Sequence, residues 1–243
     1  MSRPDYKLIV IYGESGVGKS SILQAGLIPV LEKKLIDTRD AVVVLQRVYI
    51  NWISQLGKGL AKQLEKTKNL AVNSEAITSF EEIFAQLKKN EQSNLLTVII
   101  FDQFEEFFFF NREPRHRREF AQFLQKCLEI PFVKIVLSLR KDYIHYLLDF
   151  SRWANLEVIN ENILDKNILY YLGNFRPSQA KLVIEELTAN SQFKIDSALT
   201  KKLVEDLAEE LGVVRPIELQ VVGAQLQDCL LYTSDAADES VSV

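Results

Sequence analysis

The sequence predicts an α/β fold, a three-layer sandwich in which helices cover both faces of a parallel β-sheet. Short, continuously apolar segments alternate along the chain with segments of helical periodicity. Strands that are buried on both faces of a parallel sheet have this apolar composition. A glycine-rich loop follows the first apolar segment, and the last third of the chain has helical periodicity only. The chain therefore divides into an α/β core and a smaller helical part.

The elements of the core follow one another in a regular order. A strand precedes the glycine-rich loop and a helix follows it, as a phosphate-binding loop requires. Pro114 suits the first turn of a later, charged amphipathic helix. Strands are predicted at residues 7–12, 41–48, 95–101, 132–139 and 156–159, and helices at 21–28, 53–64, 79–89, 114–128, 177–189, 197–211 and 216–228.

Three regions are expected from these elements. Residues 1–161 form a core of the P-loop type, and residues 162–228 form a helical lid that enters an incomplete winged-helix region. Residues 229–243 break the preceding helical pattern and resemble the translated read-through of a sequencing-library adapter, so we expect a non-native tail there. A natural acidic tail is the alternative.

The composition is that of an ordinary globular protein. The chain has 243 residues, of which 47% are hydrophobic and 26% are charged. The net charge of −4 does not favour a nucleic-acid surface. The apolar runs are too short to span a bilayer, no signal peptide is visible, and two cysteines indicate no disulfide framework. We expect a cytoplasmic protein with no membrane partner.

Residues 13–20 fit the phosphate-binding pattern G-x-x-x-x-G-K-[ST] at every fixed position. Glycines let backbone N–H groups turn inward around a phosphate. Lys19 can reach the β- and γ-phosphates, and the Ser20 hydroxyl can bind Mg²⁺. ATP or GTP and Mg²⁺ are therefore the expected ligands. The predicted phosphate-binding residues are Gly13, Glu14, Ser15, Gly16, Val17, Gly18, Lys19, Ser20 and Ser21.

A carboxylate, Asp102, ends the apolar segment 96–101. P-loop NTPases place an aspartate that organises Mg²⁺ at the end of such a strand, beside the loop. Asp102 is therefore the predicted partner of Ser20 at the metal.

Two further carboxylates, Glu105 and Glu106, follow closely. Either could polarise the attacking water, and either could instead be a solvated acid at a helix start. Residues 107–110 are four consecutive phenylalanines, which favour a core or lid surface over a base-stacking platform. Arg140 ends the apolar segment 132–139, where it could sense the γ-phosphate or form an ordinary ion pair.

Together these motifs resemble the STAND class of P-loop NTPases, and most closely the bacterial novel STAND NTPase group. The resemblance covers residues 6–228. Its most specific parts are residues 13–27 and 102–106, supported by residues 138–143. It implies an ATP-driven switch that closes on ATP binding and resets on hydrolysis, with Glu105 slightly preferred for water activation and Arg140 for sensing the γ-phosphate. It also implies that Pro216 lies near the adenine.

The sequence departs from the family pattern at two informative positions. Gln103 follows the metal-site aspartate where many relatives carry a second acid, which implies slow hydrolysis. The G-x-P element expected around Pro216 lacks its glycine, because Val214 stands there.

The resemblance also implies partners. These are nucleotide-dependent self-association and effector domains outside this chain. A nucleotide-binding scaffold without meaningful hydrolysis and a DNA-associated AAA-like ATPase are the alternatives, the second disfavoured by the charge.

Overall fold

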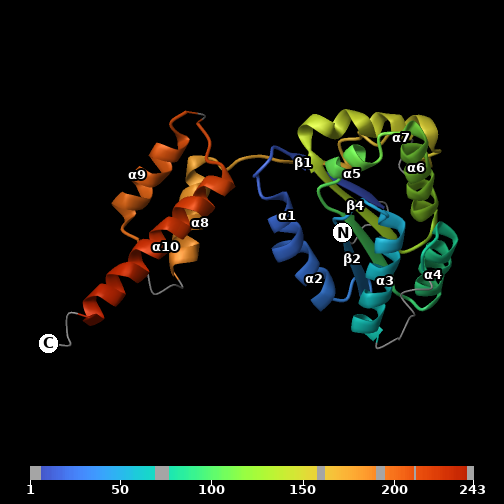
Figure 1. Ribbon diagram of the computed structural model, residues 1–243, viewed down its shortest axis with the longest axis horizontal. Coiled ribbons are helices and arrows are strands. Elements are labelled where there is room, and N and C mark those ends of the chain that lie inside the picture. The colour runs from blue at the N-terminus through green and yellow to red at the C-terminus, as the bar shows by residue number, and fades with distance from the viewer. Residues whose placement is uncertain (1–6, 69–76, 158–161, 190–194, 211, 240–243) are drawn as a thin grey trace. The chain divides into compact units, whose positions relative to one another are not determined.

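The computed structural model describes residues 7–68, 77–157, 162–189, 195–210 and 212–239. The chain divides into two compact units. The first comprises Met1–Glu14 and Lys19–Leu172, and the second comprises Ser15–Gly18 and Gly173–Val243. In Figure 1 the first unit is a sheet with helices on both faces, and the second is a group of helices.

The first unit is built on a five-stranded sheet in which every neighbouring pair of strands is parallel. The strand order is β2-β3-β4-β1-β5. Because the strands are parallel, their carboxyl ends meet at one edge of the sheet, where α/β proteins usually bind ligands. The strands are β1 (Leu8–Gly13), β2 (Ala41–Gln46), β3 (Leu96–Phe101), β4 (Val133–Arg140) and β5 (Leu169–Leu172).

Alternate strand residues enter two different cores, one on each face of the sheet. Val42 and Val44 of β2 belong to a large core rich in aromatic residues, whereas Ala41 and Val43 belong to a smaller aliphatic core. The smaller core is covered by the π-helical η1 (Ile22–Leu27), which continues directly from α1 (Lys19–Ser21), and by α2 (Ile28–Lys33). The larger is covered by α3 (Trp52–Lys68), α4 (Phe80–Gln92), α5 (Glu105–Phe110), α6 (Pro114–Glu129), the 3-10 helix η3 (Lys141–Tyr146) and α7 (Leu147–Trp153).

The predicted three-layer α/β class is confirmed, with one strand misplaced. The chain forms β5 within residues that the sequence pattern assigned to a helical region. Two tyrosines of β5, Tyr170 and Tyr171, are exposed, so the strand lacks the continuous apolar pattern of a buried strand. The strand predicted at 156–159 falls partly on 158–161, outside the described residues, and Leu156 lies in no strand.

The second unit contains α8 (Pro177–Ala189), α9 (Ser197–Ala208) and α10 (Pro216–Glu239). Ala180, Val204 and Val214 form its small core. An antiparallel bridge joins Phe175 to Val214. The helical character predicted for this region is confirmed, but the expected break after residue 228 is wrong, because α10 continues to Glu239. The predicted boundary after residue 161, the winged-helix assignment and the non-native origin of the tail stay predictions.

Helices in the part of the chain that the structure describes do not combine the length and apolar character needed to cross a bilayer.

Candidate functional site

The phosphate-binding loop connects β1 to α1 at the carboxyl edge of the sheet. Gly16 and Gly18 have φ angles of +76° and +91°. Residues with a Cβ rarely adopt this left-handed backbone conformation. The space that a Cβ of Gly18 would occupy is open. Backbone conformation, and not lack of space, therefore requires glycine at position 18.

The Lys19 ammonium folds back over the loop. Its Nζ donates hydrogen bonds to the carbonyl oxygens of Gly13, at 3.1 Å, and Glu14, at 2.7 Å. Burial lowers the pKa of Lys19, an effect that the nearby carboxylates of Glu105 and Asp102 oppose. Lys19 is thus held at the loop in a position from which a phosphate can attract it.

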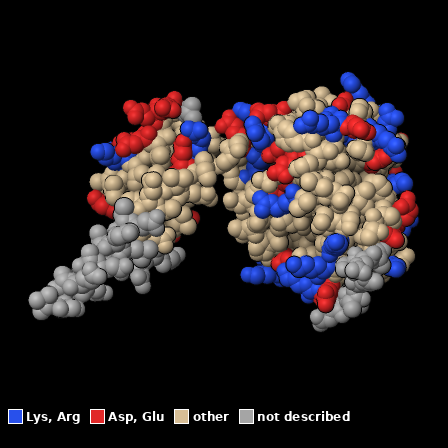
Figure 2. All heavy atoms as spheres, in the orientation of Figure 1, with Lys and Arg blue, Asp and Glu red and all other residues tan. Residues whose placement is uncertain are grey.

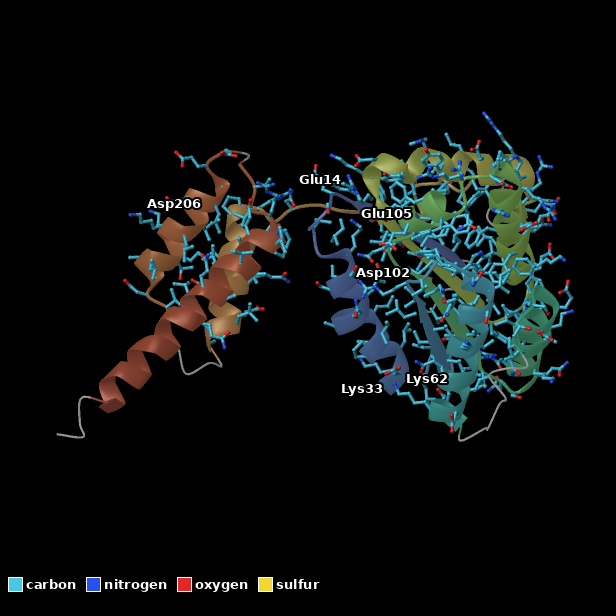
Figure 3. All side chains as sticks on the ribbon, in the orientation of Figure 1. Glu14, Lys33, Lys62, Asp102, Glu105 and Asp206 are labelled. Atoms are coloured by element: carbon cyan, nitrogen blue, oxygen red, sulfur yellow. The ribbon has the colours of Figure 1, made fainter. Side chains whose placement is uncertain are left out.

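The Ser20 hydroxyl donates a hydrogen bond to Asp102 Oδ1 at 3.0 Å. This bond joins the first turn after the loop to the end of β3, although β4 lies between β1 and β3 in the sheet. The Asp102 carboxylate is buried, and its Oδ1 also accepts the Gln103 backbone N–H at 3.0 Å. Figure 3 shows Asp102 and Glu105 at the same end of the sheet.

Asp102 and Ser20 fit a Mg²⁺ ion. Mg²⁺ prefers oxygen ligands, and P-loop proteins hold it with a Ser or Thr hydroxyl and an aspartate. One buried oxygen nearby, Ser138 Oγ, forms no hydrogen bond among the described residues. Since Leu137 pairs with Phe101 in the sheet, Ser138 of β4 lies level with Asp102, the residue that follows β3. A buried hydroxyl of this kind requires a polar partner, such as a metal-bound water.

Three residues of this site carry no sequence motif. Arg47 Nε lies 3.2 Å from Asp102 Oδ2, and the Tyr49 hydroxyl donates to the Asp102 carbonyl oxygen at 2.7 Å. Ser138 is the third. One signal could have found Arg47: it follows the apolar segment of β2 as Asp102 follows that of β3. The order of the strands, which the sequence does not reveal, is needed to bring the two ends together.

Glu105 is the first residue of α5 and is tied to the end of β4. Its Oε2 accepts the Arg140 backbone N–H at 3.1 Å. Burial raises the pKa of Glu105. For the side chain of Glu106, which is partly buried, no hydrogen bond or ion pair is found in the described part of the chain. The geometry therefore favours Glu105 of the two candidates, while its role in water activation stays a prediction.

The turn before α5 has an unusual backbone. Gln103 has a φ of +54°, which is uncommon for a residue with a side chain. The next residue, Phe104, donates its N–H to the Ser138 carbonyl oxygen at 2.7 Å. These contacts carry the chain sharply from the end of β3 into α5. They place Glu105 beside β4.

Arg140 is the last residue of β4 and pairs with Gly13 in the sheet. Its Nη2 contacts Asp142 Oδ2 at 2.8 Å, and this hydrogen bond raises the pKa of Arg140. The guanidinium thus forms the ion pair that sequence reasoning left as one alternative. Sensing of the γ-phosphate stays a prediction.

A second ion pair links the phosphate loop to η3. Lys141 Nζ lies 2.6 Å from Glu14 Oε1, and the hydrogen bond raises the pKa of Lys141. Glu14 is thus held at the loop by its side chain. Ser15, Val17 and Ser21 are loop or first-turn residues, and their predicted phosphate contacts remain untested.

The phenylalanine run anchors α5. Phe107 and Phe108 are buried in the larger core, whereas Phe109 and Phe110 are about half exposed. Phe104 and Phe107 stack with ring centroids 5.1 Å apart. The preference for core over a base-stacking platform is confirmed for Phe107 and Phe108.

Pro216, the predicted adenine contact, is the first residue of α10 in the second unit. Its relation to the phosphate loop stays a prediction.

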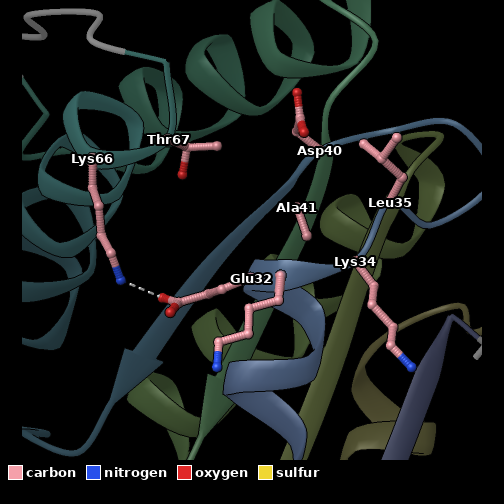
Figure 4. Close-up of a pocket in the computed structure, with 8 residues that line it drawn as sticks. Glu32, Lys34, Leu35, Asp40, Ala41, Lys66 and Thr67 are labelled. Carbon is pink, nitrogen blue, oxygen red and sulfur yellow. Dashed lines mark hydrogen bonds and ion pairs between the residues drawn. The ribbon is translucent and has the colours of Figure 1, made fainter.

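A hollow of the first unit lies elsewhere. It has a volume of about 260 Å³ and lies where β2 begins, beside the ends of α2 and α3 (Figure 4). The Lys66 ammonium pairs there with Glu32 at 2.7 Å. This hollow is at the end of β2 opposite the phosphate-binding loop, so it is not the candidate nucleotide site. The candidate site is identified by its buried charged residues and not by a hollow.

The sequence matches the family Novel STAND NTPase 1 over residues 2–218. This match confirms the resemblance that the sequence motifs indicated. No curated protein matches the chain.

Solved structures of low sequence identity share the fold. Two structures of the ORC2 protein of Aeropyrum pernix, described as ADPNP-ADP complexes and as an ADP form, give TM-scores of 0.67 and 0.68 at 12% identity. They are matched over 95% of this chain, which spans 58% and 59% of the ORC2 chains. A Walker-type ATPase of Pyrococcus abyssi gives 0.57 at 15% identity, over 98% of this chain and 72% of that one. At these identities the likeness establishes the fold alone.

Proposed function

The chain belongs to the Novel STAND NTPase 1 family, and on this premise we propose that it is an ATP-binding, slowly hydrolysing regulatory switch module. The observation that carries the proposal is the hydrogen bond between Ser20 Oγ and Asp102 Oδ1, at 3.0 Å. It brings the end of the phosphate loop to the aspartate at which P-loop ATPases organise Mg²⁺.

Each site residue has a defined task in this proposal. Backbone N–H groups of the loop bind the phosphates, and Lys19 moves from the loop carbonyls to the β- and γ-phosphates. Ser20 and Asp102 hold Mg²⁺, which neutralises phosphate charge. Glu105 orients and polarises the attacking water, with its carboxylate fixed by the Arg140 N–H. The Arg140 side chain exchanges Asp142 for the γ-phosphate.

Slow turnover is expected because the residue after Asp102 is Gln103 and not an acid. Gln103 supplies no second carboxylate there, so one acid fewer is available to activate water. Its backbone holds a left-handed conformation that Phe104 and Ser138 maintain through their hydrogen bond. We expect a rate of about one turnover per minute or less, as for unassisted P-loop switches.

Nucleotide binding is tested by comparing Mg²⁺-ATP affinity in the wild type and in Lys19→Ala. We expect a loss of at least about tenfold, because the cation that faces the phosphates is removed. Lys7→Ala is a matched control. Lys7 is also a partly buried lysine bonded to two backbone carbonyl oxygens, Leu128 and Ile130, but it precedes β1 at the opposite edge of the sheet. Equal affinity in the wild type and Lys19→Ala would refute the proposal.

A scaffold without meaningful hydrolysis is separated from a switch by single-turnover assays. In a switch, Glu105→Gln slows hydrolysis about 100-fold or more, the usual contribution of a general base, while Glu106→Gln has a small effect. A wild-type rate no faster than that of Glu105→Gln supports the scaffold.

One observation favours an anionic partner and hence the DNA-associated alternative. Lys58, Lys62 and Lys66 are exposed on α3 at four-residue spacing, which places them on one face of the helix. Figure 2 shows basic side chains at the end of the first unit where Figure 3 labels Lys33 and Lys62. The net charge of −4 opposes this alternative. Binding of duplex DNA at physiological ionic strength that weakens with salt, and that Lys58→Gln and Lys62→Gln reduce, would support it.

The proposed switch has three further features. It self-associates when nucleotide binds, it acts with effector domains outside this chain, and it is cytoplasmic. Light scattering with and without Mg²⁺-ATP tests the first. A mass that does not change with nucleotide would remove self-association from the proposal.

A further inference from the structure

Arg47 lies beside the carboxylate that is expected to organise the metal. Gln46, the last residue of β2, pairs with Phe101, the last residue of β3. The two residues that follow, Arg47 and Asp102, are therefore level with each other, just beyond the ends of neighbouring strands. Arg47 Nε is 3.2 Å from Asp102 Oδ2. The Asp102 side chain is 1% exposed, whereas the Arg47 side chain is 40% exposed.

The two oxygens of Asp102 face different groups. Oδ1 accepts hydrogen bonds from the Ser20 hydroxyl and the Gln103 backbone N–H. Oδ2 faces the Arg47 guanidinium and accepts no hydrogen bond among the described residues. The Tyr49 hydroxyl fixes the backbone at Asp102 through the carbonyl oxygen. One side of the carboxylate thus faces Ser20, the other residue expected to hold Mg²⁺, and the other side faces the Arg47 cation.

A buried carboxylate requires a compensating positive charge, and a guanidinium supplies it at every accessible pH. A Mg²⁺ ion at the Oδ1 side would lie close to this guanidinium. Repulsion between the two cations weakens metal binding, and it is only partly screened where the site is buried. Because Arg47 is partly exposed, its long side chain can turn toward solvent when the metal enters.

We propose that Arg47 is an internal cation that competes with Mg²⁺ for Asp102 and so sets the Mg²⁺ concentration at which the nucleotide is retained. The proposal rests on the proposed function, because it assumes that Ser20 and Asp102 hold the metal. Arg47 is a positioning residue here, since it acts on the metal through Asp102.

The test compares the Mg²⁺ dependence of nucleotide binding in Arg47→Gln, Arg47→Lys and the wild type, with a fluorescent ATP analogue. Arg47→Gln lowers the half-saturating Mg²⁺ concentration by about three- to tenfold, because Asp102 loses the competing charge. Arg47→Lys keeps the charge and stays within about twofold of the wild type. Arg115→Gln, at an exposed pair with Glu119 on α6, is the matched control and changes nothing.

A second variant protects the test against loss of folding in Arg47→Gln. Arg47→His carries a cation that is lost as pH rises through the usual histidine range near 6.5. Its Mg²⁺ requirement falls more steeply than that of the wild type or Arg47→Lys between about pH 5.5 and 8. Parallel pH curves for the three proteins overturn the proposal.

Two other outcomes also overturn it. An unchanged Mg²⁺ requirement in Arg47→Gln, with normal nucleotide affinity, shows that Arg47 does not compete, and leaves the proposed function intact. If Arg47→Gln weakens nucleotide binding by the same factor in the presence of Mg²⁺ and in the presence of EDTA, then Arg47 binds phosphate directly.

If the wild type binds no nucleotide, the proposed function fails, and thermal unfolding with Mg²⁺ alone decides the inference. Stabilisation by Mg²⁺ that is larger in Arg47→Gln than in the wild type supports competition at Asp102, because binding of a metal to the folded state raises the unfolding temperature. Equal stabilisation in the two proteins overturns it.

Discussion

The two ends of the same parallel sheet carry similar residues in different settings. At the amino end of β2, Glu32 and Lys66 pair at the rim of a hollow, with side chains 29% and 61% exposed. At the carboxyl end, Asp102 is buried and contacts Ser20 and Arg47. Pairs that water surrounds contribute little energy, whereas a buried charge must be compensated by fixed partners.

The difference teaches where chemistry can be organised in this fold. Buried charges interact strongly because little water screens them. Partial burial also lowers the pKa of Lys19 and raises that of Glu105, two groups at the carboxyl end. Depth of burial, and not the size of a cavity, thus separates the candidate site from the hollow.

The largest expected effect comes from removing the buried charge at the carboxyl end. Asp102→Asn should weaken Mg²⁺-ATP binding about 100-fold, because the metal loses its carboxylate and Arg47 loses its counter-ion. Glu32→Gln, which neutralises a carboxylate at the other end, should leave the affinity unchanged. Isothermal titration of both variants checks this, and similar losses in the two would erase the distinction between the ends.

Much of the carboxyl end could be predicted because its motifs are local. The phosphate loop is a contiguous pattern, and Asp102 follows an apolar strand directly. Arg47 and Tyr49 could not be predicted, because their contacts with Asp102 depend on β2 lying next to β3. Ser138 was missed as a site residue for the same reason. It reaches the site only because β4 lies beside β3.

The fold itself was predictable where the apolar pattern is strong. β3 and β4 are buried along almost their whole length, so continuous apolar runs revealed them. β5 was missed because an edge strand with two exposed tyrosines has no such run. The continuation of α10 to Glu239 was missed because polar residues after position 231 hide helical periodicity.

A smaller effect is expected in the pH dependence of hydrolysis. Burial raises the pKa of Glu105, so its basic form appears only as pH rises through a value above the ordinary glutamate range. The single-turnover rate should therefore increase with pH, by about tenfold per pH unit below that pKa, and then become constant. Rates between about pH 4.5 and 8 check the position of this acidic limb.

Two variants assign that limb. Glu106→Gln should keep it, and Glu105→Gln should lose it together with most of the rate. If the limb lies at the ordinary glutamate pKa, or survives in Glu105→Gln, then another group is titrating and the carboxyl end is less desolvated than the structure indicates.

The smallest effect is expected at the amino end. Lys66→Gln removes the exposed pair with Glu32 and should lower the free energy of unfolding by less than about 1 kcal/mol. The difference from the wild type should shrink as salt increases, because exposed charges are screened. Urea unfolding at low and high ionic strength measures both values. A loss well above about 1 kcal/mol that persists in high salt would show that this pair is as strongly desolvated as Asp102 and Arg47. The contrast between the two ends of the sheet would then rest on the nucleotide motifs alone.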